Sequence, residues 1–185
     1  MNSFGSLLRV SIYGESHGAA VGIVLDGCPP GIALQENDFK TDMERRRAGQ
    51  PGTTTRVEED LPIIASGIFK GYTTGAPIHI FIENRNTRSL DYERNRLTPR
   101  PGREDWVASR KFAGFEDFRG GGHFSGRLTA ALVAAGIIAK KIVAPVSINA
   151  FLLKENELRA RAVQAAGEGD SIGGIVECIV ADCPV

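Results

Sequence analysis

Hydrophobic residues alternate with polar ones in several short stretches of the chain, and a period of two is typical of a β-strand with one buried face. Ile78, Ile80 and Ile82 illustrate the pattern, since their side chains would all lie on the same side of one strand. Alternation of this kind, together with runs rich in valine and isoleucine, predicts strands over residues 7–13, 20–26, 61–66, 78–83, 146–153 and 175–181.

Three other segments have the pattern of helices. Residues 36–47 begin with acidic side chains and end with arginines, which complements the helix dipole, and Phe39 and Met43 would face the core. Residues 128–142 carry almost no polar side chain before Lys140, so this helix is expected to be buried between layers. A third helix is expected near residues 157–166. The chain is therefore predicted to mix α and β elements.

Periodicity is lost between residues 84 and 122. This segment is rich in arginine, glycine and proline, which predicts a long loop, and loops of such length are usually functional or disordered. Aromatic residues recur through the segment and favour an ordered loop; they are Tyr92, Trp106, Phe112, Phe115 and Phe118.

Charge is balanced, but the choice of basic residue is uneven. The 185-residue chain has 22 basic and 22 acidic residues, so there is no overall attraction to nucleic acid or to a membrane surface. Sixteen of the basic residues are arginine, and nine of these lie between Arg85 and Arg127. Arginine at this density suits planar anions such as carboxylate and phosphate. A hydrophobic content of 42% allows one sizeable core or an incomplete larger one.

Three features favour a cytoplasmic protein. The three cysteines, Cys28, Cys178 and Cys183, are odd in number and lack metal-ligand spacing, so we expect reduced thiols and no metal site. The first residues lack the basic and apolar regions of a signal peptide. The longest apolar run, over 128–139, is shorter than a membrane span needs, so no membrane association is expected.

Two glycine-rich turns carry the candidate chemistry. Residues 119–127 place three glycines before His123, Ser125 and Arg127 at the start of the predicted buried helix. Backbone N–H groups at a helix N-terminus bind anions, and Arg127 would add a bidentate cation. The second turn, Gly-Glu-Ser-His-Gly at 14–18, holds Ser16 and His17, which could move a proton near neutral pH. Read singly, either turn could be purely structural.

Two basic stretches could add to such a site. Arg45, Arg46 and Arg47 end the first predicted helix and are followed by a polar stretch, 48–55, and Arg56, which exceeds what the helix dipole requires. Residues 100–106, Arg-Pro-Gly-Arg-Glu-Asp-Trp, would by themselves be interpreted as solvated charge. The third histidine, His79, alternates with strand isoleucines and is expected to be structural or at the surface.

Taken together, these stretches resemble chorismate synthase along the whole chain. The resemblance rests on the 14–18 turn, the triple arginine, residues 66–78 and 86–92, and the Ser-Gly-Arg-x-Thr core at 125–129. It implies one domain over 1–185 of class α+β: a β-α-β sandwich of antiparallel sheets around helices, here incomplete, in a homotetramer. It also implies conversion of 5-enolpyruvylshikimate 3-phosphate to chorismate and phosphate by anti-1,4-elimination with reduced FMN.

The resemblance also implies roles for individual residues. His17 matches an active-site histidine at the departing phosphate, and Ser16 and Arg127 match substrate-binding residues. The residues that match cofactor-binding positions of the family are Arg46, Arg47, His123, Phe124 and Ser125. Arg47 also matches a substrate-binding position. Electrons would come from a separate flavin reductase or from NADPH bound by this protein, as in bifunctional members.

The sequence departs from the family in two ways. Where the family has Arg-Pro-Gly-His-Ala-Asp, this chain has Arg103 and Glu104, so a second active-site histidine is replaced by a group that cannot act as an acid near pH 7. Family members are also considerably longer, and their second half supplies further FMN contacts and a catalytic aspartate. The chain is therefore expected to be a fragment, or a truncated remnant that only binds ligand or other subunits.

Two further protein classes share single features with this sequence. Residues 121–127 approach the glycine spacing of a P-loop nucleotide hydrolase, but they have arginine for lysine and Leu128 where serine or threonine would bind magnesium. A nucleic-acid-binding module would use the arginines and aromatic rings of residues 85–127, although the neutral net charge and the interspersed acids weaken that interpretation.

Overall fold

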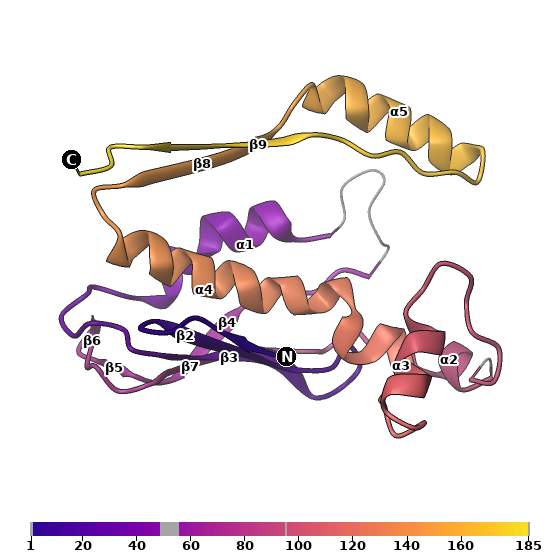
Figure 1. Ribbon diagram of the computed structural model, residues 1–185, viewed down its shortest axis with the longest axis horizontal. Helices are drawn as coiled ribbons and strands as arrows, with labels where there is room; N and C mark the ends of the chain where they lie inside the picture. The colour runs from indigo at the N-terminus through magenta and orange to yellow at the C-terminus, as the bar shows by residue number, and fades with distance from the viewer. Residues whose placement is uncertain (1, 49–55, 95, 185) are drawn as a thin grey trace.

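The structure is a computed structural model that describes residues 2–48, 56–94 and 96–184. Its base is a five-stranded antiparallel sheet in the order β1-β2-β3-β7-β4 (Figure 1). The strands are β1 (Ser3–Phe4), β2 (Arg9–Gly14), β3 (Ala20–Asp26), β4 (Pro62–Ser66) and β7 (Ile78–Glu83). Predicted strands at 20–26 and 78–83 are confirmed at both ends, and Ile23 pairs with Ile80 at the centre of the sheet.

Two helices cover one face of this sheet. They are α4 (Thr129–Ile142) and α1 (Lys40–Arg46), the latter preceded by a 3₁₀ turn at Glu36–Phe39. Phe39 and Ile138 are fully buried against the isoleucines of β3 and β7. Ala130 and Ala134 are also fully buried, and their small side chains let α4 lie close to the sheet. The prediction of a helix buried between layers is confirmed.

A second β layer lies on the other side of the helices. Strands β8 (Ser147–Leu152) and β9 (Val176–Ala181) form an antiparallel ribbon above α1 and α4, with α5 (Glu155–Gly167) between them in sequence (Figure 1). The Arg45 guanidinium donates a hydrogen bond to the Ala150 carbonyl and so ties α1 to this ribbon. The order sheet, helices, ribbon is the predicted β-α-β arrangement, and the α+β class is confirmed.

Residues 84–94 and 96–122 have defined structure, as expected, but they are not only loop. They contain α2 (Leu90–Arg94), α3 (Asp105–Lys111) and a 3₁₀ segment at Arg119–Phe124 that precedes a short 3₁₀ turn at Gly126–Leu128. Helices of five and seven residues are too short to give a visible hydrophobic period. A small hairpin, β5 (Ile68–Phe69) with β6 (Tyr72–Thr73), and β1 were missed for the same reason.

One helical stretch, Arg119–Ile142, is long and apolar enough to cross a membrane by length and composition. Half of its most apolar window is nevertheless buried inside the protein. The α-helix itself has 14 residues, roughly 21 Å at the usual rise, which is short of the about 30 Å of a bilayer core. We therefore interpret the stretch as a core helix with its preceding turn.

Candidate active site

A cavity of about 500 Å³ lies at the end of the sheet where α1, the N-terminal turn of α4, the 14–18 turn and the 84–122 segment meet; we call it the arginine cavity. It brings together seven of the residues singled out in the sequence: Ser16, His17, Arg46, Arg103, Phe124, Ser125 and Arg127. It is also lined by Arg56, Glu58, Asp60, Tyr92, Arg100 and Glu104. Side chains up to 111 positions apart in the chain therefore share one hollow.

Arg127 and Arg46 are held by a single buried carboxylate, that of Asp60. Arg46 Nη1 lies 2.7 Å from Asp60 Oδ2, and Arg127 Nη1 contacts Asp60 Oδ1. Only 2% of the Asp60 side chain is exposed. A buried ion pair is stable only when its remaining donors are also satisfied, so these contacts fix both guanidinium groups in place.

Two further N–H donors of each arginine are also bonded, which, counting bonds to the described residues, leaves two of the five on each guanidinium for a ligand. Arg127 donates from Nε to Asn84 Oδ1 at 2.8 Å and from Nη2 to the Glu83 carbonyl at 3.2 Å. Arg46 donates from Nε to Thr129 Oγ1 at 3.2 Å and from Nη2 to the Gly126 carbonyl at 3.3 Å. Desolvation by burial lowers the pKa of the Arg46 guanidinium, which nonetheless stays charged at any physiological pH.

A second arginine–carboxylate pair supports Ser16. Arg56 donates from Nη1 to the Ser16 carbonyl at 2.9 Å and to Ser16 Oγ at 3.0 Å, while its Nη2 lies 2.6 Å from Glu58 Oε1. Burial opposes ionisation of Glu58, yet the bonds from Arg56 and from two backbone N–H groups hold its pKa below the usual value. Asn84 joins both networks, since its Oδ1 accepts from Arg127 Nε and, at 3.3 Å, from Arg56 Nη2. Its Nδ2 donates to the carbonyls of Glu15 and Gly18.

The cavity keeps an excess of positive charge despite these pairs. Five arginines line it against three carboxylates, those of Glu58, Asp60 and Glu104. Arg100 is bonded to Asp105, but within the described part of the chain the guanidinium of Arg103 has no hydrogen bond or ion pair. The lining is therefore suited to an anion with several negative charges.

His17 lies beside this charge and is neutral at pH 7. Burial, followed by the positive charges of Arg56 and Arg119, holds the pKa of His17 below its ordinary value of 6.5. Its Nδ1 lies 2.9 Å from Ser89 Oγ, and its ring packs edge-on to Tyr92 at 5.2 Å. These contacts fix the ring and leave Nε2 as the nitrogen available to a ligand.

The three glycines of the 119–124 segment make this arrangement possible. Gly120, Gly121 and Gly122 all have positive φ, and Gly122 at φ 53°, ψ −127° is in a region that other residues avoid. A Cβ on Gly120 would lie 2.5 Å from the His17 ring, and one on Gly122 would lie 2.0 Å from the Asp117 carbonyl oxygen. Ser125 caps the next turn by accepting from the Arg127 N–H at 3.3 Å.

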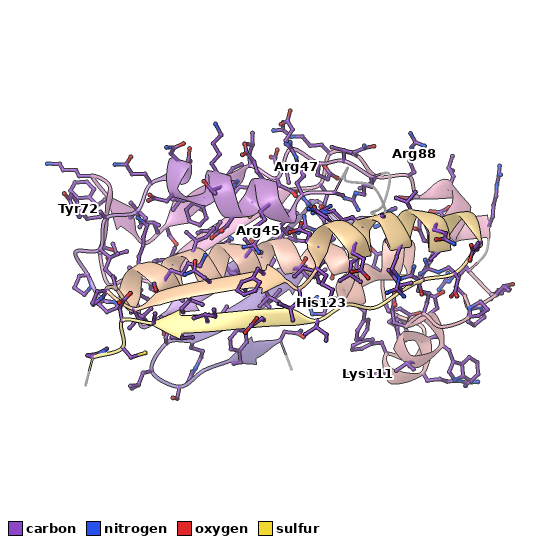
Figure 2. The ribbon with its side chains drawn as sticks, turned by 90° about the horizontal axis from the view of Figure 1, so that it is seen from above. Arg45, Arg47, Tyr72, Arg88, Lys111 and His123 are labelled. Carbon is purple, nitrogen blue, oxygen red and sulfur yellow. The ribbon has the colours of Figure 1, made fainter. Side chains whose placement is uncertain are left out.

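Two residues predicted from the resemblance lie outside the cavity lining. Arg47 directly follows α1 and has an exposed side chain, and His123 lies apart from it (Figure 2), in the lining of a second cavity. The His123 ring nitrogens are bonded to the Gly14 carbonyl at 2.9 Å and to Asn2 Oδ1 at 3.0 Å, which gives this side chain a structural position. The predicted polar continuation after Arg47 lies, for residues 49–55, outside the described residues.

Sequence reasoning missed the carboxylates of the site. Glu58 and Asp60 form part of a Glu-Glu-Asp run that is typical of solvated charge, yet both are buried. One signal could have found them: the chain has as many acidic as basic residues, so clustered arginines in a protein core require nearby acids. His79, expected to be structural or superficial, lies 2.6 Å from the Tyr13 hydroxyl through Nε2.

Known proteins similar to this chain belong to a single family. The family model described as chorismate synthase matches residues 8–156. The chain is 59% identical to a chorismate synthase of Chitinophaga pinensis, over all of this chain and 57% of that protein. It is 41% identical to that of Thermococcus kodakarensis, over 97% of this chain and 59% of that protein.

A solved structure of a chorismate synthase has the same fold. It matches with a TM-score of 0.70 at 23% identity, over 97% of this chain and 59% of the other. The chain thus spans somewhat more than half the length of these relatives. Because the family match includes both glycine turns, the end of α1 and the start of α4, the chain belongs to the chorismate synthase family.

Proposed function

We propose that the arginine cavity binds 5-enolpyruvylshikimate 3-phosphate together with reduced FMN and promotes elimination of phosphate to give chorismate. One observation carries the proposal: His17, neutral at pH 7, shares a positively charged hollow with Arg46 and Arg127, both held rigidly by Asp60. Family membership gives the chemical identity of the ligands. On the same family membership, we also propose that residues 1–185 form one domain, that the protein is a homotetramer and that it is cytoplasmic.

The substrate's anionic groups match the lining. Its phosphate and two carboxylates are planar or tetrahedral oxyanions that guanidinium groups recognise by paired hydrogen bonds. Arg127 and Arg46 are preorganised by their protein contacts, and Arg103 offers its donors without a competing carboxylate at bonding distance. Preorganised donors favour the charge that develops on a leaving phosphate, since no reorganisation is needed during the reaction.

The residues present also fit a flavin. Phe124 is half-exposed beside the glycine turn and offers an aromatic surface, while Ser125 and Arg46 offer a hydroxyl and a cation within the same lining. Reduced FMN, when bound, would supply electron density that helps the phosphate leave. Arg47 and His123 remain proposed cofactor contacts, but only after a movement of either side chain, since neither faces the cavity. NADPH as a source of electrons is proposed on the family resemblance alone.

The reaction breaks the C3–O bond, whose electron pair leaves with the phosphate, and a C6–H bond, whose hydrogen leaves as a proton while its electron pair forms the new carbon–carbon double bond. The proton released at C6 balances the one that the departing phosphate takes up. His17 can assist at the phosphate, because a nearby anion stabilises the imidazolium form and offsets the burial that now opposes it. The free site would hold His17 neutral, and the bound phosphate would make it a proton donor to the leaving oxygen. Ser16 and Arg56 keep the backbone of the 14–18 turn in place for this contact.

The pKa of His17 should therefore rise when an anion binds. In the free protein its pKa lies below 6.5 through burial and the charges of Arg56 and Arg119. Saturating inorganic phosphate should raise it by about one unit, because one nearby charge shifts a pKa by roughly that amount. NMR titration of the ring protons measures this directly. His79, bonded to Tyr13 on another part of the sheet, is the internal control, and an unchanged His17 pKa contradicts the proposed contact.

Arg103 should limit turnover more than binding. A guanidinium can offset anionic charge but cannot transfer a proton near pH 7. Arg103→His is expected to raise the rate of chorismate formation at least about tenfold, since general acid–base groups typically contribute more than that. Phosphate affinity should change by less than about threefold, because Arg46 and Arg127 remain. Equal rates in both proteins would show that position 103 carries no proton in this reaction.

The direct test uses the 185-residue chain with 5-enolpyruvylshikimate 3-phosphate and reduced FMN without oxygen. We expect chorismate and inorganic phosphate in equal amounts. A second candidate, a remnant that binds ligand without turnover, is favoured by apolar side chains exposed on the β8–β9 ribbon, such as Val176 and Val180. Flavin or phosphate binding without product would identify the remnant, and absence of both would overturn the proposed function.

A further inference from the structure

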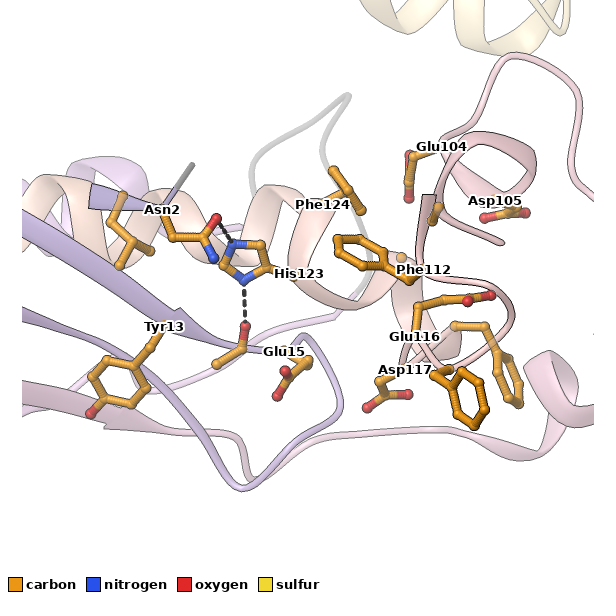
Figure 3. A pocket seen from close by; sticks show the side chains of 16 residues that line it. Asn2, Tyr13, Glu15, Glu104, Asp105, Phe112, Glu116, Asp117, His123 and Phe124 are labelled. Carbon is orange, nitrogen blue, oxygen red and sulfur yellow. Dashed lines mark hydrogen bonds between the residues drawn. The ribbon is translucent and has the colours of Figure 1, made fainter. Parts of the chain in front are cut away.

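A second cavity, of about 440 Å³, lies on the opposite side of the glycine turn, and we call it the aromatic cavity. Its walls come from the end of β2, from α3 and from the segment that follows α3 (Figure 3). Four phenylalanines line it, Phe112, Phe115, Phe118 and Phe124, whereas the Tyr13 ring points away from them (Figure 3) and its hydroxyl lies 2.6 Å from His79 Nε2. Phe124 and Glu104 line both cavities, and Phe124 and His123 are the residues of this lining that are proposed above as cofactor contacts.

Phenyl rings at the cavity remain open to solvent. The side chains of Phe112 and Phe124 are about two-fifths exposed, and their ring centroids lie 6.0 Å apart. Phe115 is 93% exposed, so nearly all of its ring surface is available to a ligand. The pair Phe112–Phe124 already attracts a cation, since Lys111 Nζ lies 5.3 Å from the first centroid and 5.9 Å from the second.

The charge of the lining is negative. Carboxylates line the cavity, and no lysine or arginine does within the described residues. Asp105 and Asp117 are bonded to Arg100 and Arg119 outside the lining, whereas Glu15 and Glu116 have no ion pair in the described part of the chain. The chemistry is thus opposite to that of the arginine cavity.

Glu116 supplies the most specific observation. Its Oε2 atom is buried and has no hydrogen-bond partner. Buried carboxylate oxygens are almost always paired, because leaving one without a donor costs free energy. His123 does not donate to Glu116, because its ring nitrogens are bonded to the Gly14 carbonyl and to Asn2 Oδ1 (Figure 3).

We propose that the aromatic cavity binds a small organic cation, an ammonium group on an apolar body, with Glu116 as its counter-charge and the phenyl rings as its walls. Cation–π contacts and a desolvated carboxylate both favour an ammonium over a neutral group of the same shape. A bare metal ion fits less well, because no group of three or more metal-ligating side chains gathers among the described residues.

The test uses 2-phenylethylammonium as a probe for the 185-residue chain, with binding measured by calorimetry and by protein NMR shifts. We expect a dissociation constant in the millimolar range or tighter, and 2-phenylethanol, the neutral analogue, should bind at least about tenfold more weakly. Glu116→Gln should weaken the amine about tenfold, and Phe115→Leu about threefold. Glu177→Gln on β9 removes the same charge outside the cavity and should leave affinity unchanged.

Three results would overturn the proposal. They are no binding of the amine, equal affinity for amine and alcohol, or equal loss in Glu116→Gln and Glu177→Gln. Because Phe115 is exposed, its leucine variant should fold normally and still reports on the site if Glu116→Gln does not fold. Phosphate binding is measured in parallel and reports on the arginine cavity. Its presence or absence therefore tests the proposed function and does not bear on amine binding in the aromatic cavity.

Discussion

Replacing Asp60 with alanine should lower the free energy of unfolding by about 3–5 kcal/mol, which is the usual cost of breaking a buried ion pair by removing one partner. Asp60 is the carboxylate shared by Arg46 and Arg127, and its side chain is 2% exposed. Alanine would leave two guanidinium groups facing each other without a counter-charge in a region that water scarcely reaches. Urea denaturation of both proteins at pH 7 measures the difference.

An exposed pair provides the matched control. Asp42 lies 2.6 Å from Lys140 Nζ on the surface between α1 and α4, where the lysine side chain is 46% exposed. Asp42→Ala should cost no more than about 1 kcal/mol, since solvent screens such pairs. Equal losses in the two variants would contradict the view that Asp60 organises the arginines.

Gly122→Ala should destabilise the protein by about 2–5 kcal/mol, through backbone strain and overpacking together. Gly122 has φ 53° and ψ −127°, and an added Cβ would meet the Asp117 carbonyl oxygen at 2.0 Å. Its own carbonyl accepts a hydrogen bond from the Ser16 N–H at 3.0 Å. The substitution therefore disturbs both glycine turns, and phosphate affinity should fall with stability.

Gly126 lies four residues further along the same segment and is the natural comparison. A Cβ there would meet no atom within 4 Å, and its φ is not positive. Gly126→Ala should change the free energy of unfolding by less than about 1 kcal/mol, and it should leave phosphate binding intact. A loss at Gly126 as large as that at Gly122 would point to general sensitivity of the turn rather than to its conformation.

The central strands and the buried helix could be read from the sequence because their environment is regular. Ile78, Ile80 and Ile82 alternate, and all three are buried on the face that α4 covers. Helix α4 follows from its apolar composition, since six of its fourteen residues are buried. In such elements the local pattern and the tertiary packing require the same residues.

The short helices and the charge partners could not be predicted in this way. Helix α3 follows a local contact, where Asp105 accepts a hydrogen bond from the Arg100 backbone N–H at 2.9 Å, rather than a hydrophobic period. The bond between Asp60 and Arg127 joins residues 67 positions apart. Sequence patterns show that arginines are abundant, whereas only the folded chain shows which acid each one meets.

The separation of these partners along the chain has a thermodynamic consequence. Ser16, Asp60 and Arg127 come together only when the sheet, α1 and α4 are all assembled, so no partly folded form can bind the same anion. A ligand of the arginine cavity would then raise the melting temperature of the whole unit in proportion to the logarithm of its concentration. Amide hydrogens of β3 and α4 should exchange more slowly with solvent in its presence, because they are released only when that unit opens.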